Sequence, residues 1–362
     1  MKAQARPLTI ASPQGTCVAD LEAKVNFLRA PSSYTIGDGK VTALETHMSW
    51  VFLVGQRVYK LKKPVCLPYL DFRSLQDRAF FCHEEVRLNA RLAPGVYLGV
   101  VALQWYEGRF ALVPEVELPA PGQTVDWLVL MRRLPAQYML SQRISSSQLR
   151  PAAIDALVRV LGRFYREAPV ISMTQNEYLD RFETQQLANR DLLLRPGFDL
   201  PDAECAITGL DHLGFKLAPM LGMRATQGQL VEGHGDLRPD HVCLMPRPLV
   251  IDCLEFNTKL RQLDPFHELA LLGMECDLAG APWVSRQLFS GLQQELGNPP
   301  SRELQAFYLA HQALLRARLA ISHLQDPLPR TPHRWPLLAQ RYVVQALHVV
   351  QNANACGAKS RG

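Results

Sequence analysis

The sequence GHGDLRPDHVCLMPRPLVIDCLEF, residues 233–256, contains the densest group of polar side chains in the chain. Asp236 lies in a turn flanked by glycine, and Asp252 ends the apolar run PLVI, so a short hairpin is predicted between them. Carboxylates on the loops beside one hairpin can face the same cavity. Phosphoryl transfer uses such a pair, because one carboxylate accepts the proton of the attacking hydroxyl and the other holds Mg²⁺ against nucleotide phosphates. His-Gly-Asp alone is typical of an ordinary tight turn, so the prediction depends on the pairing with Asp252.

Helical periodicity dominates the sequence around this segment. Apolar residues recur at helix spacing within residues 151–166. The same spacing predicts helices at 173–194, 206–222, 264–279, 284–296, 301–324 and 334–352. In this half of the chain, only residues 229–236 and 242–252 have a strand-like pattern.

The first part of the chain has a different period. Alternation of apolar and polar residues predicts strands at 40–45, 50–54, 57–62, 96–103, 110–113 and 127–131. Ser74 and Asp77 form a capping box that starts a helix running to Leu92, and a further helix is predicted at 19–30, after a loose tail at 1–18. We therefore predict an α+β protein with two lobes and a cleft between them. The N-lobe, residues 1–132, is an antiparallel sheet with one internal helix, and the C-lobe, residues 133–362, is mostly helical.

The composition is that of a globular protein. Hydrophobic residues make up 48% and charged residues 20%, which excludes disorder as the main state. The net charge of +5 suits small anionic ligands and is too diffuse to indicate nucleic-acid binding. We find no secretory signal and no uncharged apolar run of the roughly 18 residues that a membrane span needs. The 8 cysteines form no C-x-x-C pair, so we expect reduced thiols in a cytoplasmic protein.

The motifs HGDL…H and VIDCLEF resemble those of the aminoglycoside phosphotransferase-like kinases, a branch of the protein-kinase-like fold. Upstream, residues 46–65 (THMSWVFLVGQRVYKLKKPV) and 70–101 (LDFRSLQDRAFFCHEEVRLNARLAPGVYLGVV) resemble the N-lobe of an uncharacterised bacterial subgroup. In that subgroup the kinase-like domain is sometimes fused to a P-loop ATPase. The sequence contains no G-x-x-x-x-G-K-[ST], so we expect no such domain in this chain. The resemblance covers roughly residues 20–350.

The resemblance implies roles for the residues of the first segment. Asp236 is the expected catalytic base and Asp252 the expected Mg²⁺ ligand. His234 and Arg238 belong to the same catalytic loop, where Arg238 offsets phosphate charge.

A kinase-like N-lobe also pairs a strand lysine with a helix glutamate. Lys60 is the expected lysine, with Lys62 on the same face as the alternative, and Glu85 is the expected glutamate, with Glu84 as the alternative. Two further groups of residues are expected to contact the nucleotide. The hydroxyls of Thr46 and Ser49 replace a glycine-rich loop at the phosphates, and backbone groups at Met131 and Arg132 contact the base.

One position departs from the family pattern. The family usually has asparagine five residues after the catalytic aspartate, and this chain has His241. Neutral imidazole suits Zn²⁺ or Mn²⁺ better than Mg²⁺. Either His241 is a metal ligand, or one metal position is weakened, or the site has lost its chemistry. A zinc site built from His234, His241, Cys243 and Cys253 matches no common ligand spacing.

We therefore expect a phosphotransferase that moves the γ-phosphate of ATP, or of GTP, to a hydroxyl of a small molecule with Mg²⁺ or Mn²⁺. The alternative is a pseudokinase that binds nucleotide or a partner. Sugars, choline-like alcohols and protein hydroxyls all remain as acceptors, and the oligomeric state and any role in antibiotic resistance stay open. An aminoglycoside pocket requires many acidic residues, for which the candidates are Asp180, Glu183, Glu275 and Asp277.

Overall fold

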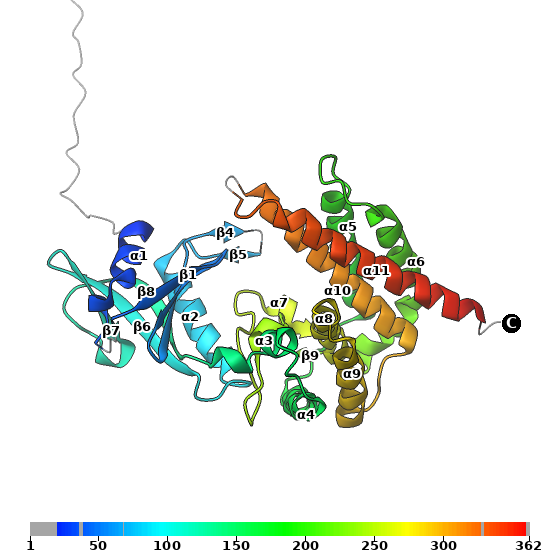
Figure 1. Ribbon diagram of the computed structural model, residues 1–362, viewed down its shortest axis with the longest axis horizontal. Helices are drawn as coiled ribbons and strands as arrows, with labels where there is room; N and C mark the ends of the chain where they lie inside the picture. The colour runs from blue at the N-terminus through cyan, green and yellow to red at the C-terminus, as the bar shows by residue number, and fades with distance from the viewer. Residues whose placement is uncertain (1–19, 36–38, 68, 327–328, 360–362) are drawn as a thin grey trace, which may run out of the picture.

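An antiparallel sheet forms the N-lobe and stands on the left of Figure 1. The computed structural model describes residues 20–35, 39–67, 69–326 and 329–359, so the tail predicted at 1–18 lies outside the described residues. The 6-stranded sheet has the order β1-β2-β3-β8-β6-β7, and neighbouring strands are antiparallel. Its strands and the helices that cover it are β1 (Val41–Glu45), β2 (Ser49–Val54), β3 (Arg57–Lys62), β6 (Tyr97–Tyr106), β7 (Arg109–Pro114), β8 (Gln123–Arg132), α1 (Leu21–Arg29) and α2 (Leu75–Asn89).

Alternation along β3 distributes its side chains between the two faces of the sheet. Leu61 packs in the apolar cluster that includes residues of α1, whereas Val58 packs with Cys82 of α2 on the opposite face. Because side chains on a strand alternate with a period of two, Lys60 and Lys62 share the face of Val58. Both lysines are therefore directed towards α2.

The C-lobe is mostly helical and stands on the right of Figure 1. Its helices are α3 (Leu140–Ser145), α4 (Pro151–Glu167), α5 (Gln175–Leu193), α6 (Ala203–Thr226), α7 (Thr258–Arg261), α8 (Pro265–Leu278), α9 (Pro282–Leu296), α10 (Arg302–Ser322) and α11 (Arg334–Lys359). Most of these helices contribute buried residues to one continuous apolar core. The predicted helices of this half are confirmed, although α6 and α11 are longer than expected and the short helices α3 and α7 were not predicted. The bilobal α+β fold is confirmed.

Short strands and 3₁₀ turns connect these elements. The two-stranded pairs are β4 (Cys66–Leu67) with β5 (Leu70–Asp71), β9 (Val231–Glu232) with β12 (Gln262–Leu263), and β10 (Val242–Cys243) with β11 (Leu249–Val250). The 3₁₀ turns are η1 (Pro31–Ser33), η2 (Glu115–Glu117), η3 (Ala136–Tyr138), η4 (Pro239–His241) and η5 (His323–Gln325). The strands predicted over 229–236 and 242–252 are therefore much shorter than expected. Glycines and prolines interrupt the ladders there, and most of this segment is loop.

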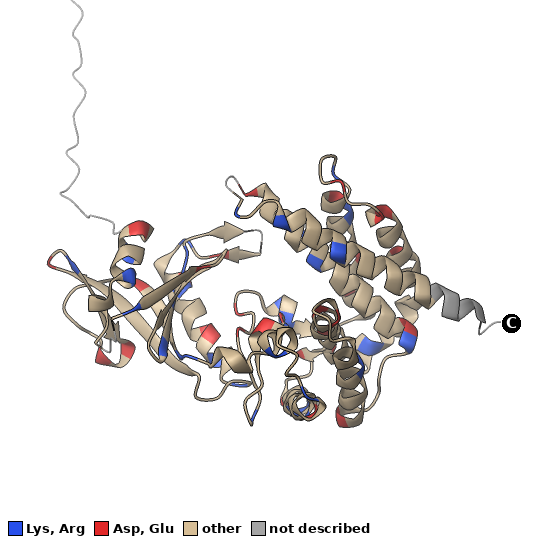
Figure 2. Ribbon diagram, viewed as in Figure 1, with Lys and Arg blue, Asp and Glu red and all other residues tan. Residues whose placement is uncertain are grey.

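The end of α2 and the start of β6 contact the C-lobe directly. The Cys253 N–H donates to Asn89 Oδ1 at 2.9 Å, and the Asp252 N–H donates to the Tyr97 hydroxyl at 3.0 Å. These bonds fix the loop of Asp252 against the N-lobe. Basic and acidic side chains are interspersed over both lobes (Figure 2). Among the described residues, no helix has both the length and the apolar character needed to cross a membrane.

Candidate active site

A buried glutamate of α8 accepts backbone hydrogen bonds from the loop that carries Asp236 and so fixes its position. Glu268 accepts hydrogen bonds from the backbone N–H groups of His234 and Gly235, at 2.9 and 2.5 Å, and from the Tyr165 hydroxyl at 2.6 Å. A Cβ on Gly233 would stand only 2.8 Å from the Glu268 carboxylate, so that position needs glycine. Sequence reasoning missed Glu268. Its signal was an acidic residue within the apolar run FHELALLGM.

His234 joins the loop of Asp236 to the loop of Asp252. Its Nε2–H donates to the Ile251 carbonyl at 2.9 Å, and its Nδ1 accepts from the Asp236 N–H at 3.2 Å. The residue is fully buried, and burial, together with His241, lowers the pKa of His234 to about 4. The ring is therefore neutral at physiological pH, and its contacts position the two aspartates.

Asp252 stands at the junction of the lobes. Its Oδ1 lies 2.7 Å from Lys60 Nζ, and its Oδ2 lies 3.4 Å from His241 Nε2. Its φ of 62° places it in the left-handed region, which aspartate tolerates better than most residues. Burial alone would raise the pKa of Asp252, but Lys60 and His241 outweigh it and hold that pKa far below its ordinary value. This carboxylate is therefore ionised and directed into the cleft.

A chain of alternating charges runs from Asp252 into the N-lobe. Lys60 Nζ lies 2.8 Å from Glu85 Oε1, and Lys62 Nζ lies 2.6 Å from Glu85 Oε2. Lys62 also pairs with Glu255 of the C-lobe. Burial lowers the pKa of Lys60 on its own, but Asp252 and Glu85 outweigh it, so that pKa stands well above its ordinary value. Both lysines are charged.

The structure separates the alternatives left by the sequence at this pair. Both lysines contact Glu85, but the Lys60 side chain is 14% exposed beside Asp252, whereas Lys62 and Glu85 are fully buried. Glu84 instead pairs with Arg87 on the outer side of α2. Lys60 is thus the lysine at the cleft.

His241 is oriented as a metal ligand would be. Its Nδ1–H donates to the Asp236 carbonyl at 2.7 Å, which leaves Nε2 as an acceptor for Arg238 at 2.9 Å. That same Nε2 faces the Asp252 carboxylate. A hydrogen bond that fixes the tautomer and the ring is the usual support of a ligating histidine. Asp252 and His241 therefore fit a divalent cation.

Asp236 is the second carboxylate of the cleft. Arg238 Nε donates to Asp236 Oδ2 at 3.0 Å. Burial raises the pKa of Asp236, but His241 and Arg238 outweigh it and hold that pKa below its ordinary value. The carboxylate is about a third exposed, which leaves it accessible from the cleft.

The predicted phosphate loop is the turn between β1 and β2, as expected. The Thr46 hydroxyl donates to the Ser49 carbonyl at 2.9 Å and accepts from the Ser49 N–H at 2.9 Å, and Ser49 is 3% exposed. Both residues thus close the turn between β1 and β2 in this conformation. Thr46 is exposed and Ser49 is buried, and contact of their hydroxyls with phosphate stays a prediction.

The predicted hinge lies at the end of β8. Met131 pairs with Val58 of β3 and Tyr97 of β6, so its backbone belongs to the sheet. The Arg132 N–H donates to the Val96 carbonyl at 2.8 Å. The Arg133 N–H donates to the Gln56 carbonyl at 2.8 Å, so the backbone N–H groups of Arg132 and Arg133 are both occupied. Contact of Met131 and Arg132 with a base stays a prediction.

Comparison with known proteins supports the fold more than the chemistry. No family model matches the sequence. An uncharacterized protein of Mycobacterium tuberculosis (strain ATCC 25618 / H37Rv) is 30% identical over 319 residues, which cover 85% of this chain and 59% of that protein. The chain thus spans less than two thirds of the length of the curated relatives that it matches.

Solved structures of small-molecule kinases resemble the whole chain. A choline/ethanolamine kinase family protein from Mesorhizobium loti matches with a TM-score of 0.51 and 14% identity, over 92% of this chain and 97% of that one. A glucosamine kinase in complex with glucosamine, ADP and inorganic phosphate matches with a TM-score of 0.53 and 12% identity, over 89% of this chain and 85% of that one. A thermostable mutant of an aminoglycoside phosphotransferase matches with a TM-score of 0.50 and 12% identity, over 87% of this chain and 94% of that one. At these identities the likeness shows the bilobal protein-kinase-like fold.

Proposed function

We propose that this chain is a phosphotransferase that moves the γ-phosphate of ATP, or of GTP, to a hydroxyl of a small molecule. The observation that supports this most strongly is the position of Lys60. Its ammonium lies between Glu85 of the N-lobe and Asp252 of the C-lobe, at 2.8 and 2.7 Å. A lysine shared between a helix glutamate and a cleft aspartate is the arrangement that a kinase-like fold uses to hold phosphates.

Each charged side chain has a distinct task in this proposal. Lys60 keeps Glu85 as its partner and exchanges Asp252 for a phosphate oxygen. Asp252 and His241 would hold Mg²⁺, or Mn²⁺, which neutralises the charge of the phosphates. Asp236 is ionised at neutral pH, so it orients the acceptor hydroxyl and takes its proton.

The surroundings of Asp236 indicate the class of acceptor. Glu275, a candidate for an acidic acceptor pocket, is occupied by Arg316 at 3.0 Å and by the Tyr342 hydroxyl at 2.8 Å. Arg316 is also close enough to Asp236 to help lower the pKa of that carboxyl, after the larger effects of burial, His241 and Arg238. An arginine beside the transfer site disfavours a polycation. We infer a neutral or anionic hydroxyl compound rather than an aminoglycoside.

The other acidic candidates do not change that inference. Asp180 and Glu183 are exposed on α5. Burial raises the pKa of Asp277 to about 6, so this carboxyl is still mostly ionised at pH 7. A single carboxylate does not supply the many acidic residues that an aminoglycoside pocket requires.

The test of the phosphotransferase proposal is Asp236→Asn with Asp240→Asn as the matched control. Asp240 lies on the same loop and is exposed. Phosphoryl transfer to a panel of hydroxyl compounds is measured by ADP release and ³¹P NMR. We expect Asp236→Asn to slow transfer roughly 10²–10⁴-fold, as the loss of a general base does, and Asp240→Asn to be near wild type. If Asp236→Asn transfers phosphate at the wild-type rate, the assignment is wrong.

A nucleotide-binding module without turnover is the second candidate. The observation that favours it is the closed set of ion pairs, since Lys60 is already neutralised by Asp252 and Arg238 by Asp236. Calorimetric titration with ATP, with and without Mg²⁺ or Mn²⁺, separates the two candidates. Tight binding that ignores the metal, with no turnover over the whole panel, would favour the module.

A further inference from the structure

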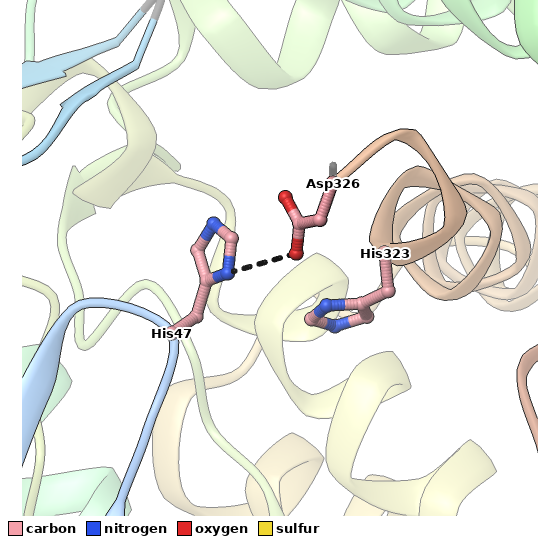
Figure 3. A group of neighbouring side chains, drawn as sticks. All are labelled: His47, His323 and Asp326. Carbon is pink, nitrogen blue, oxygen red and sulfur yellow. Dashed lines mark ion pairs between the residues drawn. The ribbon is translucent and has the colours of Figure 1, made fainter. Parts of the chain in front are cut away.

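A second group of metal-ligating side chains lies outside the proposed active site, where the turn between β1 and β2 meets the C-lobe. His47 belongs to that turn, and His323 and Asp326 lie at the end of α10, in and just after η5 (Figure 3). One potential ligand atom from each residue lies within 4.8 Å of the other two. The group therefore combines one ligand from the N-lobe with two from the C-lobe.

The spacing of these three side chains suits an intervening ion better than direct contact. His47 Nδ1 stands 3.7 Å from Asp326 Oδ2, which is longer than a hydrogen bond. Two ligands of one tetrahedral zinc ion stand about 3.3 Å apart, because each bond is about 2.0–2.1 Å long. A closure of at most about 1.5 Å between any two of these atoms, by side-chain rotation, would bring all three into that geometry.

Packing against α11 holds one of the imidazoles in place. The His323 ring stacks on Trp335, with centroids 4.0 Å apart and an interplanar angle of 22°. The Trp335 indole N–H donates to the Arg330 carbonyl at 2.7 Å. His47 meets His323 edge-on, at 5.6 Å and 86°. A ligand whose ring is already oriented loses little freedom on binding a metal.

An ion pair keeps the two lobes together at this point. Arg330, from the segment before α11, pairs with Glu45 at the end of β1, and its guanidinium also donates to the Glu45 carbonyl at 3.2 Å. Lys63 pairs with the same carboxylate. The turn that carries His47 is thus already placed beside His323 and Asp326.

We propose that His47, His323 and Asp326 form a Zn²⁺ site that joins the two lobes. Two imidazoles and one carboxylate, with a fourth position for water, are a ligand set that Zn²⁺ prefers and that Mg²⁺, which prefers oxygen ligands, does not. Bound Zn²⁺ fixes the turn between β1 and β2 against the C-lobe. Bound Zn²⁺ should also slow the opening of a nucleotide cleft between the lobes, and this consequence rests on the proposed function. The metal site itself does not depend on that function.

The test is calorimetric titration of the metal-free full chain with ZnCl₂ in the absence of nucleotide. We expect a site whose affinity is reduced at least 10-fold in His47→Ala and in His323→Ala, since each removes one of three ligands. Zinc bound at Asp252 and His241 should be unaffected by these two substitutions. His212→Ala is the matched control, because His212 is an exposed histidine of α6. Far-ultraviolet circular dichroism verifies that each variant is folded. Unchanged zinc affinity in both ligand variants overturns the proposal, and so does affinity that is lost only in His241→Ala.

Cobalt provides a spectroscopic readout of the same site. Co²⁺ in a tetrahedral site with nitrogen and oxygen ligands has visible absorption bands, which we expect in the wild type and not in Asp326→Asn. Zn²⁺ should also raise the Tm of the wild type with the logarithm of its concentration above the Kd, and should raise that of His47→Ala by less. A zinc-dependent rise of equal size in His47→Ala would contradict a link between the lobes. None of these readouts depends on phosphoryl transfer, so failure of the metal site and failure of the proposed function are distinguishable.

Discussion

The sharing of Glu85 by two lysines gives neighbouring residues of one strand different tasks. Lys60 faces Asp252 and the cleft, whereas Lys62 is fully buried between Glu85 and Glu255. Removing one partner of a buried ion pair leaves a desolvated charge, which costs much more than the pair contributes. The two lysines should therefore respond differently to the same substitution.

We predict that Lys62→Met lowers the free energy of unfolding by about 3–5 kcal/mol, because Glu255 then loses its buried partner. Lys60→Met should destabilise the fold less, because Glu85 keeps Lys62, but it should slow phosphoryl transfer roughly 10²-fold or more. Urea unfolding followed by tryptophan fluorescence and the transfer assay measure the two effects. A Lys62→Met variant as stable as wild type would contradict this division, as would a fully active Lys60→Met variant.

Part of this site was predictable from the sequence. The period of two places Lys60 on the face that meets α2, and the position of Glu85 on that helix completes the contact. The pairing of Glu255 with Lys62 joins residues 193 positions apart. No local pattern encodes which of several carboxylates reaches a given lysine over such a distance, so this contact required the structure.

Among the secondary-structure elements, α8 contributes most to the shape of the site. Asp264 caps it, accepting from the Phe266 N–H at 2.9 Å. One turn later, Glu268 accepts two backbone N–H groups of the loop that carries Asp236. The helix therefore determines where that loop lies. The sequence predicted the helix but not the buried carboxylate that contacts the loop.

We predict that Glu268→Gln destabilises the fold by about 1–3 kcal/mol and lowers kcat. The N–H groups of His234 and Gly235 both reach Oε1, and the Tyr165 hydroxyl donates to Oε2. Glutamine has one acceptor oxygen, so its NH₂ group then faces either these N–H groups or the Tyr165 hydroxyl, and a buried donor loses its acceptor. The matched control is Glu303→Gln, which removes an exposed pair with Lys216 and should change stability by about 0–1 kcal/mol. Urea unfolding and steady-state kinetics make the comparison, and equal stability losses in the two variants would refute this role of Glu268.

For the whole molecule, the net charge of +5 has a different meaning from the one first inferred. The sequence predicted a pair between a strand lysine and a helix glutamate, and a role for Arg238 at phosphate. In the structure Lys60, Lys62 and Arg238 each pair with a carboxylate. The excess charge is therefore elsewhere. Composition gives the balance of charges, but only the packing of the two lobes decides which of them are neutralised.

The stability of the whole molecule should fall as the pH falls below about 6.5, because buried histidines are neutral in the folded state. Burial lowers the pKa of His267 to about 4, although nearby Asp264 opposes the shift. Its ring contacts the buried His311, with centroids 5.1 Å apart, and burial holds the pKa of His311 well below its ordinary value. Since unfolding returns each group to an ordinary pKa of about 6.5, the unfolded chain takes up protons that the folded chain excludes. This contribution is present above pH 6.5 and is lost as the pH falls towards 4.

We therefore predict that His267→Gln flattens the dependence of unfolding free energy on pH. Between about pH 6 and 4.5, the slope should decrease by about 1.4 kcal/mol per pH unit, the effect of one proton. His212→Gln, on the exposed surface of α6, should keep the wild-type slope. Urea unfolding at several pH values measures all three proteins. His234 adds to the slope in the same direction, so the difference between His267→Gln and wild type isolates His267 from it. A His267→Gln slope equal to that of wild type would mean that this ring is already protonated in the folded core.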